Sequence, residues 1–155
     1  MSTILLVSAI FGAFVLMEGV AWFTHKYVMH GFLWSIHRDH HQHREGFFER
    51  NDLFFLVFAT PGCSLIVCGI VYSIPALLGG GIGISLYGLC YFLVHDVFIH
   101  QRFRLFKSTD SVYFKAIRKA HKVHHKNQGK EDQECFGLLF VSRKYLHQAI
   151  KAKRS

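Results

Sequence analysis

The spacing of its histidines constrains this chain more than any other feature of the sequence. A pair separated by four residues, followed by a triplet of the form His-x2-His-His, occurs twice in the same order. Ten of the twelve histidines fall on this pattern. They are His25, His30, His37, His40 and His41 in the first half, and His95, His100, His121, His124 and His125 in the second. Any fold proposed for the chain must explain this repeat.

The triplets are typical of metal ligands carried on a helix. Residues i, i+3 and i+4 share one face of an α-helix, so the three imidazoles of each triplet point the same way. Neutral imidazole is the commonest metal ligand and suits iron, copper, nickel or zinc. One metal cannot use ten nitrogens, whereas two metals can use about five each. Ordinary surface or core histidines would not repeat in this way, so the sequence predicts a site for two metal ions.

The two pairs need a different explanation, because residues i and i+5 lie roughly 140° apart on a regular α-helix. Such a pair can reach one site at a helix end or at a π-bulge, or its members can serve two metals. Gly31, directly after His30, suits a helix end. A haem would use only one or two histidines, and a zinc finger needs cysteine or other ligand spacings.

Hydrophobicity places the chain in a membrane. Hydrophobic residues make up 51% of the sequence, although the formal net charge is +8. Apolar runs at about 3–23, 53–73 and 76–99 are each long enough to cross a bilayer, which takes about 20 residues. Pro75 and the glycines at 79, 80, 81 and 83 are interpreted as breaks near a hairpin of the last two spans. We therefore expect an all-α integral membrane protein with three transmembrane helices, with four as the alternative.

The distribution of basic residues predicts the orientation. With three spans, all eighteen Lys and Arg residues lie in 24–52 and 100–155, on one side of the membrane. The positive-inside rule makes this side cytoplasmic. The histidines that follow the spans lie there too, so we expect a cytoplasmic, helical, histidine-rich cap and a single domain over 1–155. Nothing in the pattern of bases and aromatics indicates a nucleic-acid binder.

The four motifs resemble the histidine boxes of bacterial β-carotene hydroxylases, within the fatty acid hydroxylase superfamily of membrane non-haem di-iron enzymes. The likeness covers nearly the whole chain and all four boxes match in spacing. The boxes mark the superfamily, and the residues between them indicate the narrower group. The matching stretches are His25-Lys-Tyr-Val-Met-His30-Gly31, His37-Arg-Asp-His40-His41, His95-Asp-Val-Phe-Ile-His100 and His121-Lys-Val-His124-His125.

This resemblance implies an activity. It implies O2-dependent hydroxylation of β-carotene at the 3-position of its β-ionone rings, giving β-cryptoxanthin and then zeaxanthin. The expected cofactors are two iron ions, for which zinc can substitute in a purified sample, with electrons from NAD(P)H through a ferredoxin. The expected location is a bacterial inner membrane. Alternatives are a fatty acyl or sterol hydroxylase or desaturase of the same superfamily, and a non-catalytic metal- or haem-binding membrane protein.

Other polar residues are candidates for supporting roles. Asp96 and Glu18 are predicted to orient metal-bound histidines, because bound imidazoles usually donate their second N–H to a neighbouring acceptor. His43 is predicted either to support the site in the same way or to lie on the polar surface. His147 lies off the repeated pattern and is predicted not to bind metal. Helices are expected to begin after the capping residues Ser35, Asp110 and Ser142.

Overall fold

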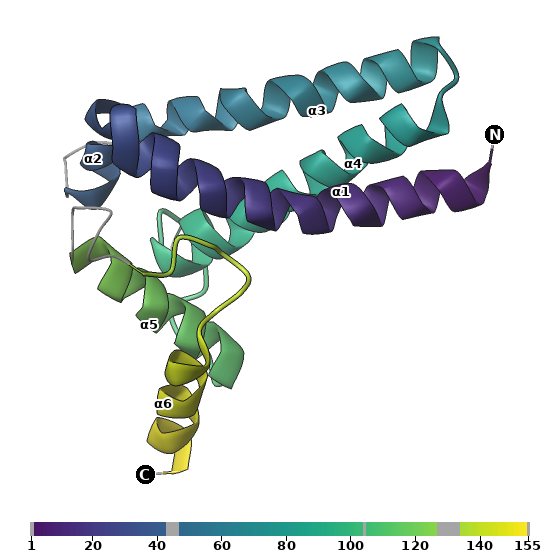
Figure 1. The fold of residues 1–155 in the computed structure, drawn as a ribbon. Coiled ribbons are helices and arrows are strands. Elements are labelled where there is room, and N and C mark those ends of the chain that lie inside the picture. The colour runs from purple at the N-terminus through teal and green to yellow at the C-terminus, as the bar shows by residue number, and fades with distance from the viewer. Residues whose placement is uncertain (1, 43–46, 104, 127–133, 155) are drawn as a thin grey trace. The chain divides into compact units, whose positions relative to one another are not determined.

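The computed structural model describes residues 2–42, 47–103, 105–126 and 134–154, and every regular element within them is helical (Figure 1). The chain forms two compact units. The span unit comprises Met1–Val20 and Asp52–Phe92, and the histidine unit comprises Ala21–Asn51 and Leu93–Ser155. Each unit is therefore built from two separate stretches of the chain.

Within the described residues, three helical stretches are long and apolar enough to cross a membrane. They are Thr3–Phe32, Arg50–Val71 and Pro75–Ile99. Large apolar side chains on them remain exposed, such as Ile4 at 81% and Phe55 at 69%. An aqueous protein would hide such surface, whereas lipid tails cover it at no cost. The prediction of three spans is confirmed.

The core of the span unit contains α1 (Thr3–Phe23), α3 (Leu53–Val71) and α4 (Pro75–Tyr91). Helices α3 and α4 form the expected hairpin (Figure 1). Pro75 occupies the first turn of α4, where its missing N–H leaves no helical bond unmade.

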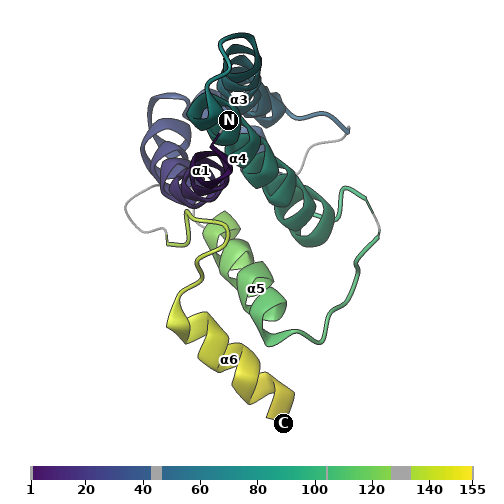
Figure 2. The ribbon, with the colours of Figure 1, turned by 90° about the vertical axis from the view of Figure 1, so that its right-hand side faces the viewer.

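The glycines of α4 do not interrupt the helix, so the interpretation of these glycines as helix breaks was wrong. They lie inside the helix, where they allow its backbone to approach its neighbours. A Cβ atom on Gly81 would lie 2.6 Å from the carbonyl oxygen of Gly62 in α3. A Cβ on Gly83 would lie 2.4 Å from the carbonyl oxygen of Ile10 in α1, the helix beside α4 in Figure 2. In a membrane, small residues of this kind provide the close packing that holds helices together.

Glu18 is the one acidic residue of α1 and is buried within the span unit. Its carboxylate accepts a hydrogen bond of 2.7 Å from the Tyr87 hydroxyl of α4. The Tyr87 ring also meets the Phe14 ring edge-on, at 5.7 Å between centroids. This polar contact therefore ties α1 to α4.

Short helices make up the histidine unit. They are the π-helix η1 (Thr24–Phe32), α2 (Trp34–His41), the π-helix η3 (Phe92–Ile99), α5 (Val112–Lys126) and α6 (Arg143–Arg154); a 3-10 turn η2 (Arg50–Asp52) adjoins them. Helices α5 and α6 share a small core of Ala116, Ala120, Tyr145 and Ala149. This core fixes α6 to the helix that carries the second triplet.

Two of the predicted helix starts need correction. Ser35 lies inside α2, which begins without a side-chain cap because Leu33 continues directly from η1 through a bond to the Val28 carbonyl. Helix α5 begins at Val112, so Ser111 and not Asp110 precedes it. Ser142 stands directly before α6, as expected.

Candidate metal centre

Both histidine pairs lie in π-helical segments. His25 and His30 belong to η1, and the second pair lies at η3, which contains His95 and ends just before His100. The His100 N–H donates to the His95 carbonyl at 2.9 Å, the i to i+5 bond that defines a π turn. This bond places residues i and i+5 above one another. The π turn thus places two histidines five residues apart on the same face of the helix, which a regular α-helix would not do.

The first histidine group contains His25, His30, His37, His41 and His124. One ring nitrogen of each lies within 4.8 Å of the others. The Nε2 atom of His25 is 3.1 Å from that of His37 and 3.1 Å from that of His124. Five imidazoles that present the same nitrogen to one point form a donor set for a metal ion.

The second histidine group contains His40, His95, His100 and His121. The Nε2 atoms of His40 and His95 lie 3.1 Å apart, and those of His100 and His121 lie 2.8 Å apart. His125 adjoins this group, with its Nε2 2.8 Å from that of His121. All ten histidines of the repeat therefore lie at one of the two groups.

The two groups exchange their central triplet histidines. His40 comes from the first half of the repeat but joins the second group, and His124 comes from the second half but joins the first. The remaining histidines stay with their own half. The two halves of the sequence repeat therefore correspond to two similar histidine groups in the structure. Each group takes one histidine from the other half. Neither half can form a complete group alone.

Neutral acceptors orient the first group. The Nδ1–H groups of His25 and His124 donate to the backbone carbonyls of Phe136 and Glu134, at 2.9 and 3.2 Å. His37 donates from Nδ1 to the Asn51 side-chain oxygen at 2.7 Å. A proton held on Nδ1 leaves the lone pair of Nε2 free to face the centre of the group.

Carboxylates orient the second group. His40 Nδ1 donates to the Glu49 carboxylate at 2.8 Å, and His95 Nδ1 lies 3.4 Å from the Asp96 carboxylate. Arg102 pairs with both acids, at 3.6 Å from Glu49 and 3.1 Å from Asp96. The guanidinium therefore offsets the negative charge around these two histidines.

Burial keeps several of these imidazoles neutral. It lowers the pKa of His37 and of His124 to about 3, and the pKa of His125 to about 4. A bond to Asn51 opposes the shift in the pKa of His37, and neighbouring imidazoles add to the shift at His124. A neutral imidazole is the form that binds a metal, so these residues need not lose a proton at neutral pH.

The other predicted site residues have mixed outcomes. Asp96 adjoins a histidine of the second group, as described. Glu18 contacts Tyr87 within the span unit. His43 lies outside the described residues. His147 is exposed on α6 and belongs to neither group.

Sequence reasoning missed Asn51, Glu49 and the carbonyls of 134 and 136. The two side chains stand 14 and 9 residues from the histidines they contact. Asp39 accepts a 2.7 Å bond from the Arg50 N–H, which anchors the segment that carries them. No periodic pattern marks these residues, although an acid and an amide close behind a triplet were a usable signal.

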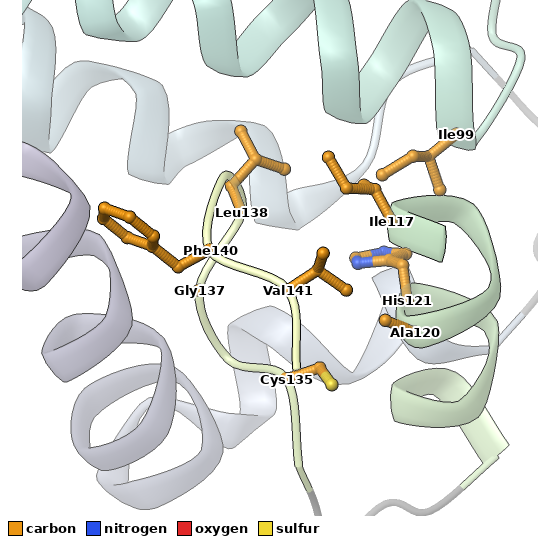
Figure 3. Close-up of a pocket in the computed structure, with 9 residues that line it drawn as sticks. All are labelled: Ile99, Ile117, Ala120, His121, Cys135, Gly137, Leu138, Phe140 and Val141. Carbon is orange, nitrogen blue, oxygen red and sulfur yellow. The ribbon is translucent and has the colours of Figure 1, made fainter. Parts of the chain in front are cut away.

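A small apolar pocket lies beside the second group (Figure 3). His121 and Ile117 of α5 line one side, and Leu138 and Val141 of the following loop line another. Its volume of about 10 Å³ admits a single water-sized molecule. It is too small for a large organic substrate.

Comparison with known proteins identifies the family. A family model described as fatty acid hydroxylase matches residues 10–148, which include every histidine of the two groups. The chain belongs to the fatty acid hydroxylase family. No solved structure matches the chain.

Named relatives of this fatty acid hydroxylase family member are β-carotene hydroxylases. One from Pseudescherichia vulneris is 42% identical over 140 residues, which cover 90% of this chain and 79% of the relative. One from Pantoea ananas is 42% identical over 125 residues, with 81% and 71% covered. One from Paracoccus sp. (strain PC1) is 34% identical over 128 residues, with 82% and 78% covered. The resemblance in the histidine boxes thus extends over most of the sequence.

Proposed function

We propose that this membrane oxidoreductase hydroxylates β-carotene at the 3-position of its β-ionone rings, giving β-cryptoxanthin and zeaxanthin, with two iron ions held by the ten histidines of the repeat. Carotenoid hydroxylation in general is supported by the family and by the named relatives. The observation that carries the metal proposal is the convergence of Nε2 atoms in two separate groups.

The residues present fit iron. All the proposed ligands are imidazoles, and the described cysteines are free and belong to neither group. A thiolate-free set of this kind suits a redox-active metal in the ferrous state, although zinc binds imidazole as well. Bound iron would supply the activation of O2 that hydroxylation of an unactivated C–H bond requires, which no side chain can supply alone.

The chain's own residues would prepare and hold this site. In five of the histidines, an oxygen acceptor at Nδ1 would keep the tautomer with Nε2 toward the metal. Burial lowers the pKa of His37, His124 and His125, which keeps these imidazoles neutral and ready to bind a metal. We infer that His37, His41, His25, His30 and His124 hold one ion, and that His40, His95, His100, His121 and His125 hold the other.

Electrons would come from NAD(P)H through a ferredoxin-like carrier. An open cleft of about 420 Å³ on the histidine unit offers a place for an acidic partner. Five of its seven lining residues are basic, and the lining comprises Lys107, Ser108, Thr109, Lys115, Arg118, Lys119 and Lys122. Positive surface steers an acidic protein toward encounter, and a high-salt buffer would weaken that step.

The location proposed is a bacterial inner membrane, with the histidine unit in the cytoplasm. The eighteen basic residues support it, because positive segments next to spans remain inside. The substrate would then arrive from the bilayer, where a long apolar carotenoid dissolves.

A cell that accumulates β-carotene provides the direct test. Expression of the chain should convert the pigment to zeaxanthin through the singly hydroxylated compound. His37→Ala should abolish conversion and His147→Ala should preserve it. Pigment analysis that finds unchanged β-carotene, with the protein present in the membrane, would contradict the proposal.

The family match also favours a second candidate, hydroxylation or desaturation of a fatty acyl chain or sterol. A reconstituted reaction under ¹⁸O2, with β-carotene and a fatty acyl lipid offered together, separates the two. Label in the carotenoid ring alone supports the first function, and label in the acyl lipid alone supports the second. Metal binding without oxygen consumption would indicate a non-catalytic protein.

A further inference from the structure

Residues 134–141 form a segment between α5 and α6, here called the strap, that lies against the first histidine group. Its backbone accepts the two hydrogen bonds from His25 and His124 described above. The ring of Phe136 meets the same two imidazoles, with centroids 5.5 and 5.2 Å away. One short segment therefore orients a histidine from each half of the repeat.

The strap has an unusual backbone at the point between the two carbonyls. Cys135 has a φ of 66°, in the left-handed region that residues other than glycine seldom adopt. Such a conformation is strained and persists only when neighbouring contacts impose it. Something outside the strap must therefore hold it in place.

Helix α6 provides that contact. The Tyr145 hydroxyl donates to the Glu134 carboxylate at 2.6 Å, and Lys144 pairs with the same oxygen. Only 2% of Tyr145 is exposed, because its ring packs in the core shared with Ala116 and Ala120 of α5. The bonds from Lys144 and Tyr145 lower the pKa of the Glu134 carboxyl, so it is ionised at neutral pH.

We propose that Tyr145 and Glu134 are positioning residues for the first histidine group: they hold the strap so that its carbonyls orient His25 and His124, and thereby set how tightly that group retains a metal ion. This inference rests on the metal site of the proposed function. It assigns a role to α6, a helix that carries none of the ten histidines.

The effect should be confined to one group. The bonds from the strap reach two histidines of the first group, whereas His40 and His95 of the second group bond to Glu49 and Asp96. Tyr145→Phe removes one hydroxyl and keeps the ring in the α5–α6 core. Tyr113→Phe is the matched control, because its hydroxyl donates at 2.6 Å to the Leu139 carbonyl, at a different point of the same strap.

The experiment measures metal release and requires no substrate. The full-length protein in detergent is loaded with Co²⁺ and mixed with a chelator, and release is followed by absorption. Wild type and Tyr113→Phe should each release two equivalents of Co²⁺, and the release rates of the two proteins should be indistinguishable. Tyr145→Phe should release one equivalent about tenfold faster, the size of effect that outer contacts of metal ligands produce, and leave the other unchanged. In a His37→Ala background, the single remaining equivalent should not respond to Tyr145→Phe.

A double-mutant cycle separates positioning from general loss of stability. If the two residues act through one bond, Glu134→Ala combined with Tyr145→Phe should accelerate release no more than the stronger single change. Equal acceleration of both equivalents, additive effects, or no effect of Tyr145→Phe would each overturn the proposal. A wild-type protein that binds fewer than two equivalents would instead overturn the two-metal site itself, together with this inference.

Discussion

The Nε2 atom of His40 lies 3.1 Å from that of His95, although 55 residues separate the two in the chain. His41 directly follows His40 in the chain, but its Nε2 atom lies 3.2 Å from that of His37, in the other group. Two adjacent side chains on α2 thus belong to different proposed metal ions.

This exchange predicts an unusual pattern of metal loss. His40→Ala combined with His95→Ala removes two ligands from the second group and should leave one metal per chain. His40→Ala combined with His41→Ala damages both groups and should leave close to none. Elemental analysis of purified variants measures the difference, with His147→Ala as a control that keeps two. Equal metal content in the two double variants would contradict the exchange.

The contact between Asn51 and His37 predicts a graded effect. Asn51→Ala removes the acceptor for the His37 Nδ1 proton and should weaken metal binding by about 10- to 100-fold. Asn51→Asp keeps an acceptor oxygen and should lose much less. Competition with a chelator of known affinity gives both values. An alanine variant that binds as tightly as wild type would show that this contact is not used.

The packing of α4 predicts opposite outcomes for one substitution at two glycines. Gly83→Ala places a methyl group 2.4 Å from the Ile10 carbonyl oxygen and should destabilise the protein by about 1–3 kcal/mol. Gly88→Ala meets nothing within 4 Å and should be neutral, or stabilising by up to about 1 kcal/mol through helix propensity. Thermal unfolding in detergent compares them. Similar melting temperatures for both would refute the close approach.

The lowered pKa values predict acid sensitivity of the metal-free protein. His37, His124 and His125 have a pKa of about 3 to 4 when folded, against 6.5 for the free side chain. Below pH 6.5 the unfolded chain binds more protons, so stability is complete above that pH and falls as the pH drops toward 4. Melting temperatures measured from pH 7.5 to 5 should decrease. Bound metal should raise the melting temperature across this range without moving the pH at which the decrease begins, because the unfolded imidazoles that take up the protons are unchanged. A melting temperature that rises on acidification would be the contrary result.

The charge distribution predicts topology. Reporter fusions should place the N-terminus outside the cytoplasm and the C-terminus inside it, because three spans separate the two ends. Both ends on one side would require an even number of crossings.

Much of the site followed from periodicity, and the rest depended on contacts that periodicity does not encode. The triplet spacing showed that His37, His40 and His41 share a face, but not that His40 serves a different group. Helix geometry predicts which face of α2 carries the three side chains. It does not predict which group each one joins, because that depends on η3 and α5, which are distant in the sequence.

The fold shows the same division. Hydrophobic runs located the spans because length and composition decide whether a helix crosses lipid. The role of the α4 glycines was wrongly predicted because the sequence alone does not distinguish a glycine that ends a helix from one that lets a neighbouring helix approach. The start of α2 was misplaced because the preceding π turn supplies backbone bonds that make a capping side chain unnecessary.

The π turns also determine how the site tolerates changes in chain length. A π turn closes its hydrogen bond over one more residue than an α-helical turn does. Loss of one residue between His25 and His30 would relax η1 to an ordinary helix and leave the pair four apart, still on one face. Gain of a residue has no comparable solution. The two histidine pairs should therefore tolerate the loss of one residue better than the gain of one, an asymmetry that comes from backbone geometry and not from the metal.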